Sequence, residues 1–204
     1  MAYRATANTE SRKAQVHENI LKAARALVSE SGFRALSVQA VAERANIATG
    51  TIYRYFDSKA TLCVALFERA TSREIEQVTA ASHIKGNARE KLEHALTIFA
   101  ERAMQNPTLA YALIAEPVDP ALDQARLDYR QAWANTFSTL IRHGIRQQEF
   151  VAQPERLCAA AMVGVMAEAL ITPDSAQLSP SQRKKQIQHL VQFCMRAVTL
   201  PPGA

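Results

Sequence analysis

Glycine, proline and cysteine are all scarce in this chain of 204 residues. Six glycines and eight prolines are too few for a collagen-like or low-complexity sequence, and they argue against a loop-rich all-β fold. Cys63, Cys158 and Cys194 lie far apart and form no CxxC pair. The sequence therefore supports neither a disulfide framework nor a zinc site, and we expect buried thiols in a reducing cytosol.

Long apolar runs are missing as well. Residues 1–13 contain no apolar segment of the kind found in a signal peptide. The most apolar stretch, residues 157–171, is interrupted by Glu168 and is shorter than the ~20 residues that span a bilayer. Hydrophobic residues still make up 48% of the chain, which is enough for a sizeable core. We therefore expect a cytoplasmic protein.

Positive charge is distributed unevenly. The formal net charge is +5, from 24 Lys and Arg against 19 Asp and Glu. Residues 1–60 hold nine of the basic and only five of the acidic residues, so most of the excess lies in the first third. This asymmetry indicates a polyanionic partner for the first part of the chain only.

Hydrophobic residues recur with helical spacing along nearly the whole chain, and no stretch alternates long enough to predict a strand. The expected fold class is all-α, with about nine helices. Asn87 with Glu90 and Ser179 with Gln182 have capping-box spacing, and Asp119 precedes a proline. One helix is expected to end before Gly32, and others are expected over 38–45, 50–56, 59–80 and 120–148. Four more are expected: one after Asn87, one beginning at Pro107, one from Pro154 to Thr172-Pro173, and one from Pro180 to before Pro201.

Residues 37–59 carry the most informative pattern. Ser37 is a plausible cap for the helix over 38–45, Asn46 tolerates the left-handed conformation of a tight turn, and Ile47 follows as an apolar plug. Thr49 is the expected cap of the next helix. Two short helices across a tight turn are typical of a helix-turn-helix, which presents its second helix to the major groove of DNA.

The second of these helices has one apolar and one polar side. Ile52 and Phe56 are expected to face the core. Hydroxyl and phenol groups suit phosphate oxygens, and a guanidinium can bind a guanine edge bidentately. Gly50 permits close approach of the backbone to a sugar-phosphate, and Lys59 adds a cation in the first turn of the next helix. The outward set comprises Thr49, Thr51, Tyr53, Arg54 and Tyr55.

The same pattern has an alternative interpretation. Short amphipathic helices joined by Asn or Gly turns also occur in all-α proteins that bind no nucleic acid, where Tyr53, Tyr55 and Phe56 would be core residues. The excess of cations in the same third of the chain favours DNA.

The segment from Ile20 to Leu66 resembles the DNA-binding domain of the TetR family of bacterial repressors. The family usually has Gly where this chain has Asn46, and Asn tolerates the same backbone conformation. The resemblance implies a small amino-terminal helix-turn-helix domain and a larger helical domain for ligand binding and dimerisation. The matching motifs are Gly32, Phe33, Leu36 and Ser37; Val41, Ala42 and Ala45; and the run from Gly50 to Lys59.

By this resemblance the helix over 50–56 is the recognition helix, and Ser37 and Gln39 also match contact positions. Gln39 and Arg54 are the expected base readers, because glutamine pairs with adenine and arginine with guanine. Tyr53, Tyr55 and Lys59 are expected to hold phosphates. The complete expected DNA-binding set is Ser37, Gln39, Thr49, Gly50, Thr51, Tyr53, Arg54, Tyr55 and Lys59.

The last two helices combine small and apolar residues. They either form a four-helix interface in a two-fold dimer, as the resemblance implies, or pack within one subunit. DNA recognition favours the dimer, because two subunits supply the two recognition helices that read a palindrome. The expected interface comprises Leu157, Ala161, Gly164, Val165, Glu168, Leu190, Val191, Cys194, Ala197 and Val198.

The middle helices are rich in aromatic residues and methionine. These side chains either line a pocket or, as the stronger interpretation has it, form plain core. The resemblance implies a small-molecule inducer, and the absence of an evident buried charge suggests an apolar or amphipathic one. We interpret the mixed-charge segment from Glu116 to Arg130 as a solvated helix face rather than a pocket rim. The expected pocket comprises Phe99, Met104, Tyr111, Ile114, Trp133, Phe137, Met162 and Met166.

No catalytic, metal or cofactor site is expected, because the five histidines are scattered and no nucleophile-base pattern is present. We predict a DNA-binding domain over 1–60 and a ligand-binding and dimerisation domain over 61–204, linked by the helix over about 58–80. The expected protein is a bacterial, nucleoid-associated repressor that a small molecule releases from a palindromic operator. The alternatives are an activator of the same fold and a helical small-molecule or lipid-binding protein without DNA.

Overall fold

The computed structural model describes residues 7–81, 83–171 and 177–199. Within these ranges the chain forms nine α-helices and no strand, with one isolated antiparallel bridge between Phe150 and Thr199. The all-α prediction is confirmed. The helices are α1 (Ala7–Ser31), α2 (Val38–Arg44), α3 (Thr49–Ile52), α4 (Lys59–Ala81), α5 (Ala88–Gln105), α6 (Pro107–Ile114), α7 (Pro120–Arg146), α8 (Glu155–Leu170) and α9 (Pro180–Arg196).

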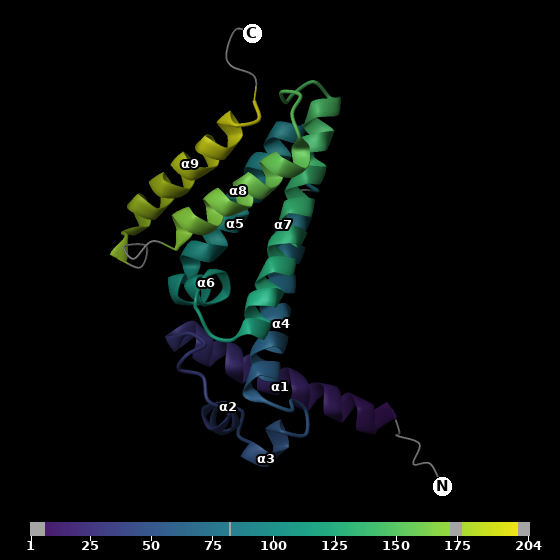
Figure 1. Ribbon diagram of the computed structural model, residues 1–204, viewed down its shortest axis with the longest axis vertical. Coiled ribbons are helices and arrows are strands. Elements are labelled where there is room, and N and C mark those ends of the chain that lie inside the picture. The colour runs from purple at the N-terminus through teal and green to yellow at the C-terminus, as the bar shows by residue number, and fades with distance from the viewer. Residues whose placement is uncertain (1–6, 82, 172–176, 200–204) are drawn as a thin grey trace.

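The helices form two unequal parts joined by long helices (Figure 1). α1 lies across the lower end of the view, with α2 and α3 below it. α4 and α7 rise from this end and pack along each other, and α5, α8 and α9 surround their upper halves. α6 lies at the junction, against both α1 and α5.

Local capping signals determine where several helices begin. Asn87 and Glu90 make both hydrogen bonds of a capping box at α5, and Ser179 and Gln182 do the same at α9. Asp119 caps α7 through the backbone N–H of Ala121 at 2.9 Å. These predicted caps are confirmed, while the predicted stops at Thr172-Pro173 and Pro201 lie outside the described residues.

The two predicted left-handed turns are also present, with φ of 76° at Gly32 and 53° at Asn46. The helix predicted over 50–56 differs from its prediction. α3 is regular only over Thr49–Ile52, and a turn continues it to Phe56 through a hydrogen bond from the Phe56 N–H to the Ile52 carbonyl. Its N-cap is Ala48, without a side-chain hydrogen bond, so the predicted capping by Thr49 was wrong.

A lower hydrophobic core holds α1, α2 and α3 together. It is completed by the first half of α4 and by residues of α6 and α7, so the small part does not close its core alone. Burying each large apolar side chain contributes about 1.5–3 kcal/mol. Its largest fully buried members are Ile20, Phe33, Leu36, Ile52, Leu62, Leu66, Phe67 and Leu122.

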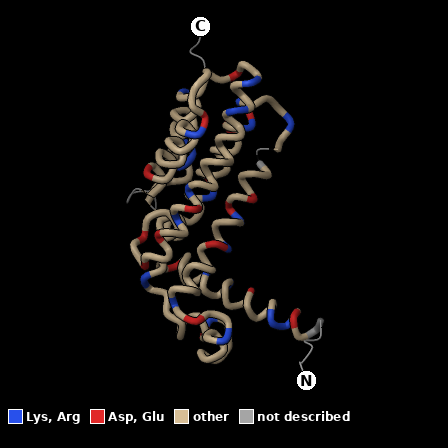
Figure 2. Tube along the Cα trace, turned by 45° about the vertical axis from the view of Figure 1, so that its right-hand side comes forward, with Lys and Arg blue, Asp and Glu red and all other residues tan. Residues whose placement is uncertain are grey.

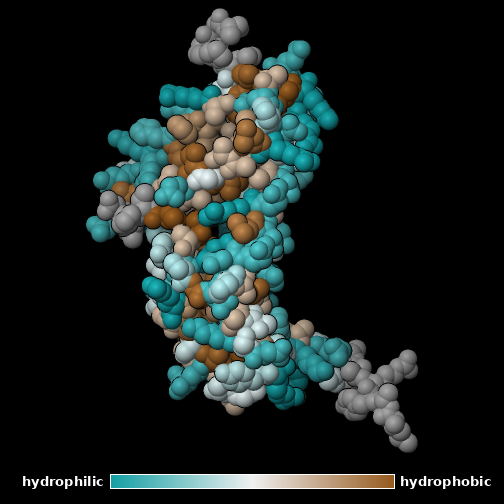
Figure 3. Space-filling model, in the orientation of Figure 1, coloured by the Kyte–Doolittle hydropathy of each residue, from teal (hydrophilic) through white to brown (hydrophobic). Residues whose placement is uncertain are grey.

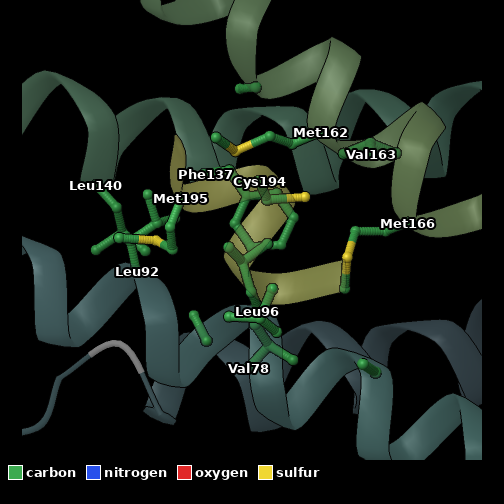
Figure 4. Close-up of a cluster of buried hydrophobic side chains, with 14 of the residues drawn as sticks. Val78, Leu92, Leu96, Phe137, Leu140, Met162, Val163, Met166, Cys194 and Met195 are labelled. Carbon is green, nitrogen blue, oxygen red and sulfur yellow. The ribbon is translucent and has the colours of Figure 1, made fainter. Parts of the chain in front are cut away.

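An upper core fills the space between α5, α7, α8 and α9, with Val78 entering from α4 (Figure 4). Leu92, Leu96 and Phe137 lie at its centre, and methionines fill the gaps around them. Cys194 is buried here, and burial raises the pKa of its thiol to about 11. No helix in the described ranges is both long and apolar enough to cross a bilayer.

Candidate nucleic-acid interface, cavity and association surface

The turn between α2 and α3 is built by local hydrogen bonds. The Ser37 hydroxyl accepts the backbone N–H of Ala40 at 3.0 Å and caps α2. At the other end of α2, the Ile47 N–H donates to the Ala42 carbonyl at 3.0 Å across the left-handed Asn46. Ile47 then packs against the lower core. This local network sets the angle at which α3 leaves the domain.

α3 presents a polar face to solvent and an apolar face to the core. Ile52 and Phe56 are buried, whereas the Tyr53 side chain is 53% exposed. Arg54 is exposed, and Tyr55 is half-buried with its ring 6.3 Å from that of His17. The side chains of Tyr53 and Tyr55 are therefore not fully buried. The alternative interpretation, in which they are core residues, required them to be.

Gly50 and Lys59 flank this polar face. A Cβ built at Gly50 would meet nothing within 4 Å, so the backbone is open to an approaching molecule. Lys59 is exposed in the first turn of α4, where the Ser58 hydroxyl accepts the Thr61 N–H at 3.1 Å. Thr49 is also exposed, and Thr51 is half-buried.

Basic and acidic positions both occur along the chain around α3 (Figure 2), and the cations there differ in their ion pairs. Arg44 makes a bidentate ion pair with Glu30, at 2.8 and 2.9 Å, and this hydrogen bonding lowers the pKa of the Glu30 carboxyl. Among the described residues, Arg54 and Lys59 have no ion pair. Gln39 is exposed, and its side-chain amide donates one N–H to Glu43 at 3.0 Å, which leaves its second N–H and its Oε1 for another partner.

A cavity of about 110 Å³ lies where the two parts of the molecule meet, bounded by α4, α5, α6, α7 and α8. Its wall is mostly apolar. Of the predicted pocket residues, Phe99, Ile114 and Trp133 line it. The edge of the Phe99 ring packs against Trp133, with ring centroids 4.6 Å apart.

The other predicted pocket residues lie elsewhere. Phe137, Met162 and Met166 are buried in the upper core, as the plain-core alternative held (Figure 4). Met104 also belongs to that core and borders a second groove between α5 and α9. Tyr111 is 45% exposed and does not line the cavity. Neighbouring helices bury Phe137, Met162, Met166 and Met104, which sequence periodicity alone cannot show.

Charged groups line the cavity, although the predicted pocket set contained none of them. Arg126 is buried, and Glu74 forms an ion pair with Arg102. Burial raises the pKa of the Tyr129 phenol well above its usual value. Arg126, Tyr129, Arg130 and Trp133 recur at one-turn spacing along α7, and this periodicity was the available signal.

The interpretation of the 116–130 segment as a solvated face was wrong for part of it, because Arg126, Tyr129 and Arg130 line the cavity, as the pocket-rim alternative held. Glu116 is 5% exposed and Arg126 is 8% exposed. Both carry charges that the sequence analysis did not expect to be buried. Each is satisfied by hydrogen bonds, which offset the cost of removing a charge from water.

The predicted association surface divides between α8 and α9. On α8, Leu157 is 68% exposed, and Ala161, Gly164 and Glu168 are exposed on the same face, with Val165 partly buried. On α9 the prediction was wrong for four residues, because Leu190, Val191, Cys194 and Val198 are buried in the upper core of the same subunit. Only Ala197 of the α9 set is exposed.

The face of α9 beside this α8 surface carries a residue that the prediction missed. Phe193 is 61% exposed. α8 and α9 run antiparallel, since Gln153 bonds the Ala197 carbonyl at one end and Gln186 bonds the Ala169 carbonyl at the other. Apolar surface covers α8 and its junction with α9 (Figure 3).

Comparison with known proteins gives matches to the amino-terminal part and to the whole fold. Residues 20–66 match the family model described as bacterial regulatory proteins, tetR family. The HTH-type transcriptional repressor KstR of Mycobacterium tuberculosis is 39% identical over 97 residues, which are 47% of this chain and 44% of that protein. The chain thus spans about half the length of the KstR proteins it matches.

Two further matches reach beyond the amino-terminal part. The fatty acid metabolism regulator protein of Bacillus subtilis is 27% identical over 137 residues, 64% of this chain and 68% of that protein. The solved structure of FadR from Bacillus subtilis in complex with stearoyl-CoA superposes with a TM-score of 0.76 at 22% identity, covering 88% of this chain and 97% of that chain. At this identity the likeness shows a shared fold.

The Ser37 cap yields a test of stability. Ser37→Ala removes the hydroxyl that accepts the Ala40 N–H, and we expect the free energy of unfolding in urea to fall by about 1 kcal/mol. Ser37→Asp retains an acceptor and should restore most of this loss, because aspartate caps helices as well as serine does. An equal loss in both variants would show that the hydroxyl does not act as a cap.

Proposed function

We propose that this chain, a member of the TetR family of bacterial regulatory proteins, is a transcriptional repressor. It binds a palindromic operator as a homodimer. Binding of a small amphipathic ligand releases it from the operator. Residues 1–60 recognise DNA, residues 61–204 bind the ligand and the second subunit, and α4 links them. The protein acts on the nucleoid in the bacterial cytoplasm. The naming of its relative KstR as a repressor supports repression.

The polar, uncovered face of α3 carries the DNA-binding part of this proposal. An exposed tyrosine, an unpaired arginine and an open glycine lie together on a helix that its other face anchors to the core. The major groove of B-DNA is about 12 Å wide and admits such a helix. α3 could enter the major groove without any apolar side chain leaving the core.

The contacts within the interface assign different roles to its members. Arg54, without an ion pair in the described part of the chain, is placed to read a guanine. Gln39 reads an adenine with its Oε1 and the N–H that does not bond to Glu43. Tyr53, Tyr55 and Lys59 bind phosphates, aided by the threonines and the backbone at Gly50. Ser37 keeps its hydroxyl on the α2 cap and contributes through that cap.

The cavity supports an amphipathic ligand with an apolar chain and an anionic group. Its apolar walls suit a hydrocarbon. Glu74 pairs with Arg102 and Asp123 pairs with Arg126 at 2.8 Å, which leaves Arg130 as the further cation of the lining. FadR, which shares the fold, has been solved with stearoyl-CoA, a molecule of this kind. The cavity volume of about 110 Å³ is below the roughly 300–1,000 Å³ of typical ligand pockets. A ligand with a long hydrocarbon chain must therefore move the surrounding helices apart. Such a ligand binds the two states of the protein unequally, which release of DNA requires.

The exposed faces of α8 and α9 support a two-fold dimer. Leu157 and Phe193 are large apolar side chains that water would otherwise surround. A Cβ at Gly164 would meet nothing within 4 Å, so a second helix can approach closely there. Four helices from two subunits would cover this surface and place the two α3 helices to read a palindrome.

The DNA-binding proposal is tested by selecting bound duplexes from a random pool. We expect a palindrome whose half-sites lie about 10 bp apart, one helical turn. Arg54→Ala should weaken operator binding about tenfold or more and relax preference at one base pair, by about 1–3 kcal/mol. Lys59→Ala should weaken binding to all duplexes and reduce the salt slope by about 1.

Arg44→Ala is the matched control, because the Arg44 guanidinium is already held by Glu30. Its effect on operator affinity should be much smaller than that of Arg54→Ala. If the protein retains no sequence above the background of the pool, the DNA-binding proposal is wrong.

The ligand proposal is tested through Trp133, the one tryptophan of the chain, which lines the cavity. Stearoyl-CoA should change its fluorescence, raise the melting temperature and release the selected operator. Stearate should bind more tightly than octadecanol, because the lining carries more cations than carboxylates. If none of the three probes alters the fluorescence or the melting temperature, the amphipathic ligand is wrong.

The dimer is tested by sedimentation at micromolar concentration. Phe193→Asp and Leu157→Asp should each weaken self-association at least about tenfold, because a buried charge replaces an apolar contact. Leu127→Asp is the matched control, since Leu127 is 58% exposed on α7 and lies outside the α8–α9 surface. A wild-type protein that sediments as a monomer would contradict the proposal.

A further inference from the structure

One buried carboxylate joins the α6–α7 loop to the amino-terminal part of the molecule. The Glu116 carboxylate accepts the backbone N–H of Phe33 at 2.7 Å and that of Arg34 at 3.0 Å. Both amides belong to the turn that follows α1. Hydrogen bonds to an ionised carboxylate are stronger than those between neutral groups, so this contact holds the turn firmly.

Gly32 makes the contact possible. A Cβ at this position would lie 2.8 Å from both carboxylate oxygens of Glu116, closer than atoms can approach without a shift. The φ of 76° at Gly32 also favours a residue without a Cβ. One glycine therefore serves both the turn and the approach of the carboxylate.

The other end of this connection reaches the cavity. Arg126, which lines the cavity, donates from Nη2 to the Ala112 carbonyl at 2.8 Å and from Nε to the Leu113 carbonyl at 3.2 Å. These carbonyls belong to the last turn of α6, and Leu113 itself lines the cavity. Glu116 lies three residues after Leu113 in the chain, so the carbonyls that Arg126 holds and the Glu116 carboxylate belong to one short segment.

A second contact connects the end of α1, which precedes the turn held by Glu116, to α2. Glu30, at the end of α1, makes the bidentate ion pair with Arg44 of α2. α2 packs against α3. The end of α1 is thus joined to α2 by a side-chain contact and, through α2, to α3.

We propose that Glu116 is a positioning residue that transmits occupancy of the cavity to the DNA-binding domain, through the turn over residues 32–34 and in parallel with α4. The inference rests on the proposed function, since it concerns regulation at the same cavity. A carboxylate held by two amides is either bonded or released, which suits a switch between two states. The contact is made in one state and broken in the other.

The first experiment needs neither ligand nor DNA. Amide hydrogen exchange at Phe33 and Arg34, followed by NMR, should accelerate about tenfold in Arg126→Met, because the last turn of α6 loses its clamp. Arg142→Met is the matched control, as Arg142 also lies on α7 but pairs with Glu155 of α8. Exchange that stays within about twofold of wild type in Arg126→Met would overturn the proposal.

The second experiment measures the ratio of operator dissociation constants with and without stearoyl-CoA. Glu116→Gln should lower this ratio about tenfold, within the range of typical allosteric coupling. Glu149→Gln is the matched control, because the Glu149 carboxylate also accepts two consecutive amides, those of Ala88 and Arg89, entirely within the larger part. It should lower the melting temperature while leaving the ratio within about twofold.

The outcomes separate the two proposals. If Glu116→Gln lowers the melting temperature but keeps the wild-type ratio, the contact persists in both states and the transmission role is refuted. If stearoyl-CoA does not affect operator binding by the wild type, the proposed ligand fails, and the exchange rates in Arg126→Met still decide the role of Glu116.

Discussion

The burial of one helix, α4, in two separate cores is the constraint on which the rest of the structure depends. Its first half places Leu62, Leu66 and Phe67 in the lower core, and Val78 enters the upper one. Neither core is complete without it, because α1, α2 and α3 leave the lower core open on one side. The hydrophobic effect therefore fixes the exposed face of α3 relative to the cavity, without any direct contact between them.

The polar groups gather where the two cores meet. Glu116, Arg126 and the pair of Glu74 with Arg102 lie at this junction, and each has hydrogen-bonded partners. A buried charge is costly unless it is paired, so such groups are sensitive to any change in their neighbours. Closely packed cores resist deformation, whereas hydrogen bonds at a junction can exchange partners. The arrangement places the adaptable contacts beside the cavity and the rigid ones on either side.

Much of the helix-turn-helix could be predicted because its signals are local. Asn46 and Gly32 specify left-handed turns through their own backbone preferences, and Ser37 caps the helix that it precedes. The amphipathic spacing of Ile52 and Phe56 correctly assigned the buried face of α3. The cavity was predicted less well, since Phe99, Ile114 and Trp133 line it while Phe137, Met162 and Met166 do not. A methionine in a core and a methionine in a pocket have the same sequence pattern, and only the neighbouring helix distinguishes them.

The amino-acid sequence alone determined the helical fold, most helix ends and the motif around α3, because helix periodicity and capping act within a few residues of one another. Tertiary structure alone decided which face of α9 is buried, leaving Phe193 exposed and Leu190 covered. It also brought Glu116 to the turn after α1, across 83 residues of chain. The reason is physical: the burial of a side chain, and the partner of a buried charge, depend on segments that are distant in the chain and meet only when the cores form.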